Sequence, residues 1–182
     1  MPTNSWLVPI TAIRRSPGTS RYERRSGPVE GLSDEGLVVA GTTVPAGGEV
    51  EADVELNVII GGIEISGEVS APWEGECRRC LRPVGGQLRA EVRELYRPRD
   101  GSAGDDEDEE TYPLAGEQLD LAPLVRDAVL LSLPLAPLCR PDCAGLCPSC
   151  GSELAEGPCG CRRATADPRW EGLDALEPRG QG

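Results

Sequence analysis

Residues 50–58 read VEADVELNV, with an apolar side chain at every second position and a polar one between. A second alternation of this kind runs from Ile63 to Trp73, directly after Gly61 and Gly62. Because successive side chains of a strand point to opposite faces, both segments predict strands with one buried face. The two glycines between them predict the turn of an antiparallel hairpin.

One helix is expected to pack on this hairpin. A third alternation over residues 88–93 predicts another strand, which completes a small antiparallel sheet. Asp120 is a favourable N-cap, and the apolar spacing after it predicts a helix over 121–133 that Pro134 ends. The acidic stretch within 100–110 is expected to be a loop. The predicted fold class is therefore α+β: a small antiparallel sheet, one packed helix and a C-terminal cysteine-rich zinc-binding region.

The chain is expected to form a single domain over residues 37–161. Residues 1–36 are locally basic, with five arginines and one glutamate between Arg14 and Arg25, and are expected to form a largely irregular arm. This arm could contact phosphate groups, or it could be a solvated tail or an edge strand. Residues 162–182 are rich in proline, glycine and charge, and are expected to be a flexible tail.

The cysteines are the strongest chemical signal in the sequence. We find no signal peptide and no apolar run of membrane-spanning length, which favours a cytoplasmic protein with reduced thiols and no membrane contact. Clustered cysteines in that setting favour metal binding over disulfides, and a thioredoxin-type redox motif would need a βαβ context. The predicted metal ligands are Cys77, Cys80, Cys139, Cys143, Cys147, Cys150, Cys159 and Cys161.

Eight thiolates suit two zinc ions with four ligands each, and each of the two CxxC pairs can place both of its sulfurs on one ion. We expect Cys77 and Cys80 to share an ion with Cys139 and Cys143. The four C-terminal cysteines would then form a compact local site. A swapped pairing is conceivable, and an iron–sulfur cluster on the same ligands is the alternative cofactor.

The composition speaks against an enzyme. The sequence contains no histidine, and a zinc ion held by four thiolates has no open position for water or a substrate. We therefore predict a non-enzymatic protein without a small-molecule substrate, in which metal binding supplies folding energy. The formal net charge of −13 opposes a general attraction to nucleic acid.

Three arginines at the first CxxC pair are the candidates for a local contact with RNA: Arg78, Arg79 and Arg82. A guanidinium group binds phosphate through paired hydrogen bonds, which makes arginine suited to this task. In the alternative interpretation, these side chains only cap and solvate the metal-binding turn.

The order of these parts resembles the YceD-like family of bacterial large ribosomal RNA subunit accumulation proteins. The likeness rests on the Cys77-Arg-Arg-Cys80 turn after a strand, the acidic connection, the apolar helix that ends at Leu133–Leu135, and the run LCRPDCAGLCPSCG at residues 138–151. It covers roughly residues 5–161. The resemblance implies a ribosome biogenesis factor needed for large-subunit (23S) ribosomal RNA to accumulate, and it implies no catalytic residue.

The resemblance also bears on the partners and on the metal sites. Family members are often encoded beside a small zinc-ribbon protein of the large subunit, which implies assembly around a basic ribosomal protein. Some members lack the cysteines that correspond to the four C-terminal ones, which implies that the site around Cys77 and Cys80 is the shared one. Three modes of action stay open: direct contact with ribosomal RNA, an acidic escort for a basic large-subunit ribosomal protein, and a thiol- or metal-responsive regulator.

Overall fold

A computed structural model describes residues 5–98, 111–161 and 169. Its centre is the expected hairpin: β5 (Glu49–Ile59) and β6 (Gly62–Glu76) are antiparallel, and Ile59 pairs with Gly62 across the turn. Gly61 adopts φ +87°, a conformation that glycine adopts without steric cost. The even-numbered side chains of β5 are buried and the odd-numbered ones point outward, so the prediction from the alternating pattern is confirmed.

The sheet is larger than the sequence suggests. β7 (Pro83–Pro98) lies antiparallel to β6 over residues 83–96, and β8 (Thr111–Leu114) lies parallel to β7. The short strands β3 (Val38–Val39) and β4 (Thr42–Thr43) pair with each other. β4 also pairs with β6, on the same edge as β5 and beyond the residues where β5 pairs. Within the described residues, seven strands form this sheet. The α+β description therefore holds, with the sheet as the dominant part. The expected small antiparallel sheet is corrected in two respects, because the sheet is larger and β8 is parallel to β7.

The prediction of a largely irregular N-terminal arm is wrong. β2 (Ser20–Pro28) pairs with β5 over its whole length, as the edge-strand alternative required. Arg24 lies opposite Asp53, and its Nη2 donates to Asp53 Oδ2 at 2.8 Å. Such a strand is stabilised by its neighbour's backbone and by charge pairs, and apolar alternation therefore does not reveal it.

Residues before position 37 also belong to the main core, so the domain does not begin there. Trp6 is fully buried, as are Val8 in β1 (Leu7–Pro9) and Ile10 after it. β1 pairs with β9 (Gln118–Asp120) in a second, two-stranded sheet, and the 3-10 turn η1 (Val29–Gly31) follows β2. The N-terminal segment is thus held by burial of apolar surface.

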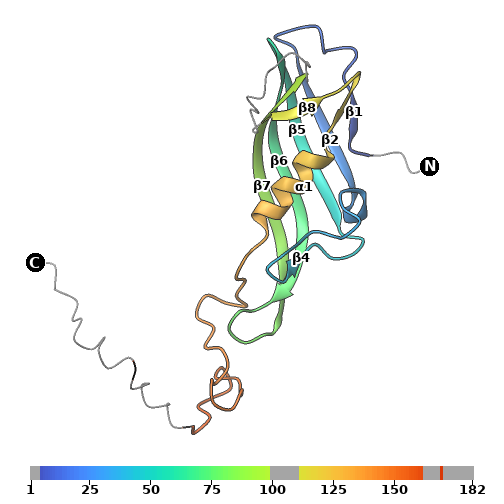
Figure 1. Ribbon diagram of the computed structural model, residues 1–182. Coiled ribbons are helices and arrows are strands. Elements are labelled where there is room, and N and C mark those ends of the chain that lie inside the picture. Colours follow the sequence, from blue (N-terminus) through green and yellow to red (C-terminus); the bar gives the residue numbers. More distant parts are fainter. Residues whose placement is uncertain (1–4, 99–110, 162–168, 170–182) are drawn as a thin grey trace, which may run out of the picture.

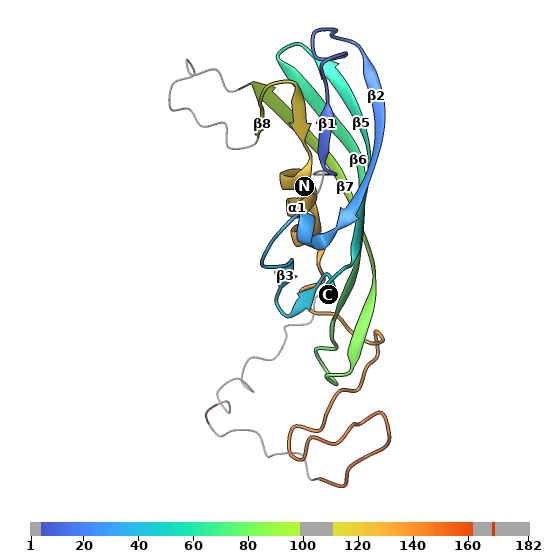
Figure 2. The same cartoon turned by 90° about the vertical axis from the view of Figure 1, so that its right-hand side faces the viewer.

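The helix α1 (Ala122–Ser132) covers one face of the sheet, where it packs against β7 and β6 (Figures 1 and 2). Leu124, Val125 and Val129 are its buried side chains. The helix begins one residue later than expected, because Leu121 occupies the N-cap position. The Oδ1 atom of Asp120 still accepts a hydrogen bond from the Ala122 N–H at 3.0 Å, so this carboxylate satisfies a free amide of the first turn.

Two expected segments, the acidic loop 100–110 and the tail 162–182, lie outside the described residues, apart from Arg169.

The helix offers a matched test of its packing. Leu124→Ala should lower the free energy of unfolding by about 2–5 kcal/mol, because Leu124 is 1% exposed between helix and sheet. Leu131→Ala, at an 88% exposed position of the same helix, should change it by less than about 0.5 kcal/mol. Urea denaturation of the metal-loaded protein measures both values, and equal effects would show that α1 is not packed as described.

Candidate metal centres

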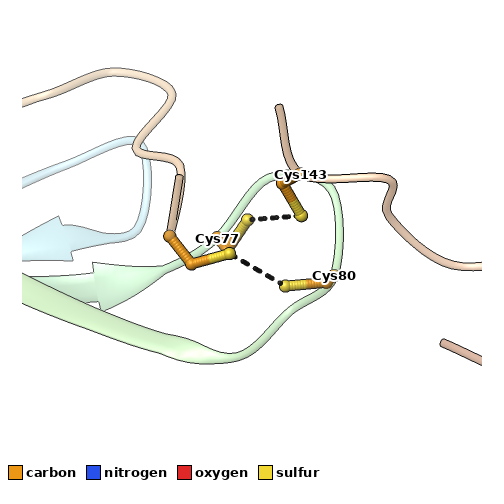
Figure 3. A group of neighbouring side chains, drawn as sticks. Cys77, Cys80 and Cys143 are labelled. Atoms are coloured by element: carbon orange, nitrogen blue, oxygen red, sulfur yellow. Dashed lines mark hydrogen bonds between the residues drawn. The ribbon is translucent and has the colours of Figure 1, made fainter. Parts of the chain in front are cut away.

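The first cysteine group joins two distant parts of the chain. Cys77 and Cys80 lie in the connection between β6 and β7, whereas Cys139 and Cys143 lie in the segment after α1. The Cys77 N–H donates to Arg82 O at 2.8 Å and the Leu81 N–H donates to Cys77 O at 2.9 Å, which closes the connection into a tight turn. The sulfur atoms of Cys77 and Cys80 point into the same space as the sulfur atom of Cys143 (Figure 3).

Backbone contacts hold the second segment against this turn. The Arg78 N–H donates to Pro137 O at 2.9 Å, and the Leu146 N–H donates to Arg79 O at 3.1 Å. The two hydrogen bonds flank Cys139 and Cys143 in sequence. The segment therefore reaches the turn in a fixed register.

The sulfur geometry suits one tetrahedral ion. Cys77 Sγ and Cys143 Sγ are 3.8 Å apart, Cys80 Sγ and Cys139 Sγ are 3.6 Å apart, and all four sulfurs lie within 4.8 Å of one another. Bonds of about 2.3 Å in a tetrahedron place neighbouring ligand atoms about 3.8 Å apart. Cys77, Cys80 and Cys143 are buried and Cys139 is exposed, so this first group is largely closed to solvent.

The second cysteine group is local in sequence and more open. The sulfurs of Cys147, Cys150, Cys159 and Cys161 lie within 4.8 Å of one another, the grouping that the spacing favours. The Gly151 N–H donates to Cys147 O at 2.9 Å, and the Cys147 N–H donates to the carbonyl of residue 152 at 2.8 Å, which forms a second tight turn. Only Cys147 is buried, while Cys150 and Cys161 are exposed.

The thiols of each group have divergent acidities. Hydrogen bonds from the backbone of Cys139 are the main reason that the pKa of Cys77 is lowered from 9.0 to about 6. Burial opposes this shift, and hydrogen bonds from the backbone of Arg79 and Cys80 add to it. The Cys143 side chain, together with burial, raises the pKa of Cys139 to about 12. In the second group, the Ser152 side chain and backbone lower the pKa of Cys150 to about 6. Four thiolates cannot stay charged together without a cation, so metal binding must displace protons.

The three arginines proposed for RNA contact all have partners inside the protein. The Arg78 guanidinium donates to the carbonyl oxygens of Ala40 and Leu135, and Arg79 Nη1 donates to Cys143 O at 2.9 Å. Sequence reasoning did not reveal these carbonyl partners, because they become neighbours only in the folded chain. The side chains tie the first turn to the β3–β4 loop and to the segment after α1.

Arg82 links the two cysteine groups. Its Nε donates to Glu153 Oε1 at 3.0 Å, and the Glu153 carboxylate raises the pKa of Arg82. Glu153 also forms a β-bridge with Leu146, between the two groups. No sequence pattern points to Glu153 as this partner. The role of Arg78, Arg79 and Arg82 in RNA contact stays a prediction, and such a contact would compete with these internal partners.

Fold and cysteine geometry together define a mainly β protein with two four-thiol groups able to hold metal ions, one between the β6–β7 turn and the segment after α1 and one within that segment. The chain belongs to the YceD family: the family model described as large ribosomal RNA subunit accumulation protein YceD matches residues 65–177. The matched range contains β7, α1 and all eight cysteines.

Mycobacterial proteins are similar to this chain over most of its length. An uncharacterized protein of Mycobacterium tuberculosis (strain ATCC 25618 / H37Rv) is 40% identical over 131 residues, which cover 71% of this chain and 63% of the relative. One of Mycobacterium leprae is 31% identical over 171 residues, or 93% of this chain and 76% of the relative. The chain thus spans less than two thirds of the first of these relatives.

A shorter match links the chain to a plant protein. The large ribosomal RNA subunit accumulation protein YCED homolog 1, chloroplastic, of Zea mays is 37% identical over 43 residues, which is 24% of this chain and 15% of the relative. No solved structure matches the chain significantly.

Paired substitutions test how the thiols share metal. The purified protein should carry about two zinc ions per chain if each four-thiol group holds one. Cys77→Ser combined with Cys139→Ser should remove one ion, because both sulfurs belong to the first group. Cys77→Ser combined with Cys147→Ser should remove both ions. Elemental analysis after gel filtration measures the ratio, and the reverse pattern would demonstrate a swapped pairing.

Metal affinity should rise with pH. The thiols of raised pKa, such as Cys139 and Cys161, must lose protons before they can bind a cation, so zinc competes with protons at each group. Titration of the reduced, metal-free protein against a chromophoric chelator should give tighter binding at about pH 8 than at about pH 6. An affinity that is independent of pH over this range would contradict ligation by thiols.

Proposed function

We propose that this protein is a non-enzymatic ribosome biogenesis factor that supports the accumulation of large-subunit (23S) ribosomal RNA in the cytoplasm. The observation that carries the proposal is the family match over residues 65–177, since the matched range includes all eight cysteines and α1, which leads into the segment with Cys139 and Cys143. Among the described residues, no helix has the length and apolarity needed to cross a membrane.

Zinc is the proposed metal, with one ion on each four-thiol group. Sulfurs within 4.8 Å of one another suit a single shared ion, whereas the ligands of an iron–sulfur cluster bind separate iron atoms and lie further apart. A zinc ion here would supply folding energy. Its four thiolates would close the coordination sphere, which supports a structural role over a catalytic one.

A protein partner is favoured over direct RNA contact by the charge distribution. The chain carries a formal net charge of −13, and many described arginines face acids of the same protein. On the outer face of the sheet, Arg89 pairs with Glu68 and Arg93 pairs with Glu64, both near 3 Å. A basic large-subunit ribosomal protein is therefore the proposed partner, with the present chain as its acidic escort.

Depletion in the native cells tests the proposed function. Loss of the protein should lower large-subunit ribosomal RNA relative to small-subunit RNA, and the wild-type gene should restore it. The variant Cys77→Ser with Cys139→Ser should fail to restore it, because the first metal group anchors the segment after α1. An unchanged ratio of the two RNAs on depletion would refute the proposal.

Crosslinking separates the two modes of action. Ultraviolet and chemical crosslinking of the tagged protein in the same cells should recover a basic large-subunit ribosomal protein in the absence of RNA. Crosslinks from large-subunit RNA to Arg78, Arg79 or Arg82 would instead make the protein a direct RNA-binding factor and would contradict the escort mode.

A further inference from the structure

One edge of the main sheet is open over most of a long strand. β7 pairs with β6 over residues 83–96, but β8 covers its outer edge only at residues 95–98. No strand in the described part of the chain pairs with the outer edge over residues 83–94. An open strand edge presents unpaired N–H and C=O groups and is a ready template for another strand.

A groove lined by residues of β7 and α1 lies beside this part of β7. Ala90, Val92, Leu124 and Ala128 give it an apolar floor, and its volume is about 140 Å³. Leu131 lines the groove and is 88% exposed, so its side chain is accessible to a partner. A strand added to β7 could place alternate side chains into this groove, as strand periodicity requires.

Three acidic side chains line the groove. Glu91 and Glu94 line it from β7 and form no ion pair within the described residues. Asp127 lines it from α1, where it accepts a hydrogen bond from Tyr112 and pairs with the exposed Arg126. An incoming segment that carries lysine or arginine would therefore meet uncompensated negative charge.

We propose that the open edge of β7 and the adjoining groove bind an extended, basic segment of a partner protein, which adds a strand to the sheet. Backbone hydrogen bonds to residues 83–94 would supply affinity, and apolar side chains in the groove with cations at Glu91 and Glu94 would supply specificity. This inference deepens the escort mode of the proposed function and rests on it for the partner's identity.

Two other occupants fit the surface less well. A second copy of this chain would bring another net charge of −13 and the same acidic border, so the two copies would repel each other. RNA would place phosphates against Glu91, Glu94 and Asp127. A basic protein segment is the occupant whose charge complements the groove.

The test uses a synthetic peptide with alternating lysine and valine, about eight residues long, as an ordinary strand would be. It should slow amide hydrogen exchange of the metal-loaded protein within residues 83–94 and leave β2, the opposite edge strand, unchanged. A peptide of the same sequence with alternate backbone amides methylated keeps the charge but cannot pair as a strand. The methylated peptide should not slow amide exchange within residues 83–94.

Charge and apolar contact are tested by matched variants. Glu91→Gln with Glu94→Gln should weaken peptide binding roughly three- to ten-fold, because two charge contacts are removed. Glu49→Gln with Glu55→Gln removes the same charge at exposed positions on β5 and should have little effect. Leu131→Ser should also weaken binding, while its circular dichroism stays that of the wild type.

Several results would overturn the inference. The inference fails if the methylated peptide binds as tightly as the unmethylated one, or if both charge variants weaken peptide binding equally. It also fails if a large-subunit RNA fragment slows amide exchange within residues 83–94. A variant of Glu91, Glu94 and Leu131 that no longer binds the peptide, yet fully restores ribosomal RNA in depleted cells, would refute the groove as a functional site. The proposed function itself would survive that result.

Discussion

The four thiols of the first cysteine group, when they share a metal ion, would fix the segment after α1 to the sheet, and they are the constraint on which that segment depends. They connect the β6–β7 turn to residues more than fifty positions later, where backbone hydrogen bonds alone would leave the segment after α1 weakly held. The core has no phenylalanine and few aromatic side chains. A bound zinc contributes on the order of 10 kcal/mol to folding in small zinc domains, comparable with the net stability of a whole domain.

The three arginines at the first CxxC pair contact groups of the same protein. Arg78 and Arg79 bind backbone carbonyls around the first cysteine group, and Arg82 binds Glu153 beside the second. Arg78 and Arg79 thus satisfy backbone carbonyls of irregular segments, and Arg82 satisfies a carboxylate. The surface left to partners is consequently more acidic than the arginine content alone suggests.

The sequence predicted those parts of the structure whose stabilising pattern is local. The hairpin, the strand β7, the helix and the grouping of the cysteines follow from period-2 alternation, helical spacing and CxxC turns. The sequence indicated β2 only as one of several alternatives, because Arg24 and its neighbours pair with β5 through charges. It did not indicate the parallel β8, because only tertiary contacts fix that strand. The partners of Arg78 and Arg82 were equally inaccessible, since they lie far away in sequence.

The open edge and the first metal group are not independent features. β7 begins directly after the turn that holds Cys80, and the segment that leads from the end of α1 reaches Cys139 in the same group. A metal ion bound by this group would therefore tie together, at one end, the strand and the helix whose residues line the groove. If metal binding fixes the spacing of the strand and the helix, a partner that needs this spacing must bind the metal-loaded protein more tightly. By thermodynamic linkage, the bound partner would then hold the metal more tightly by the same factor.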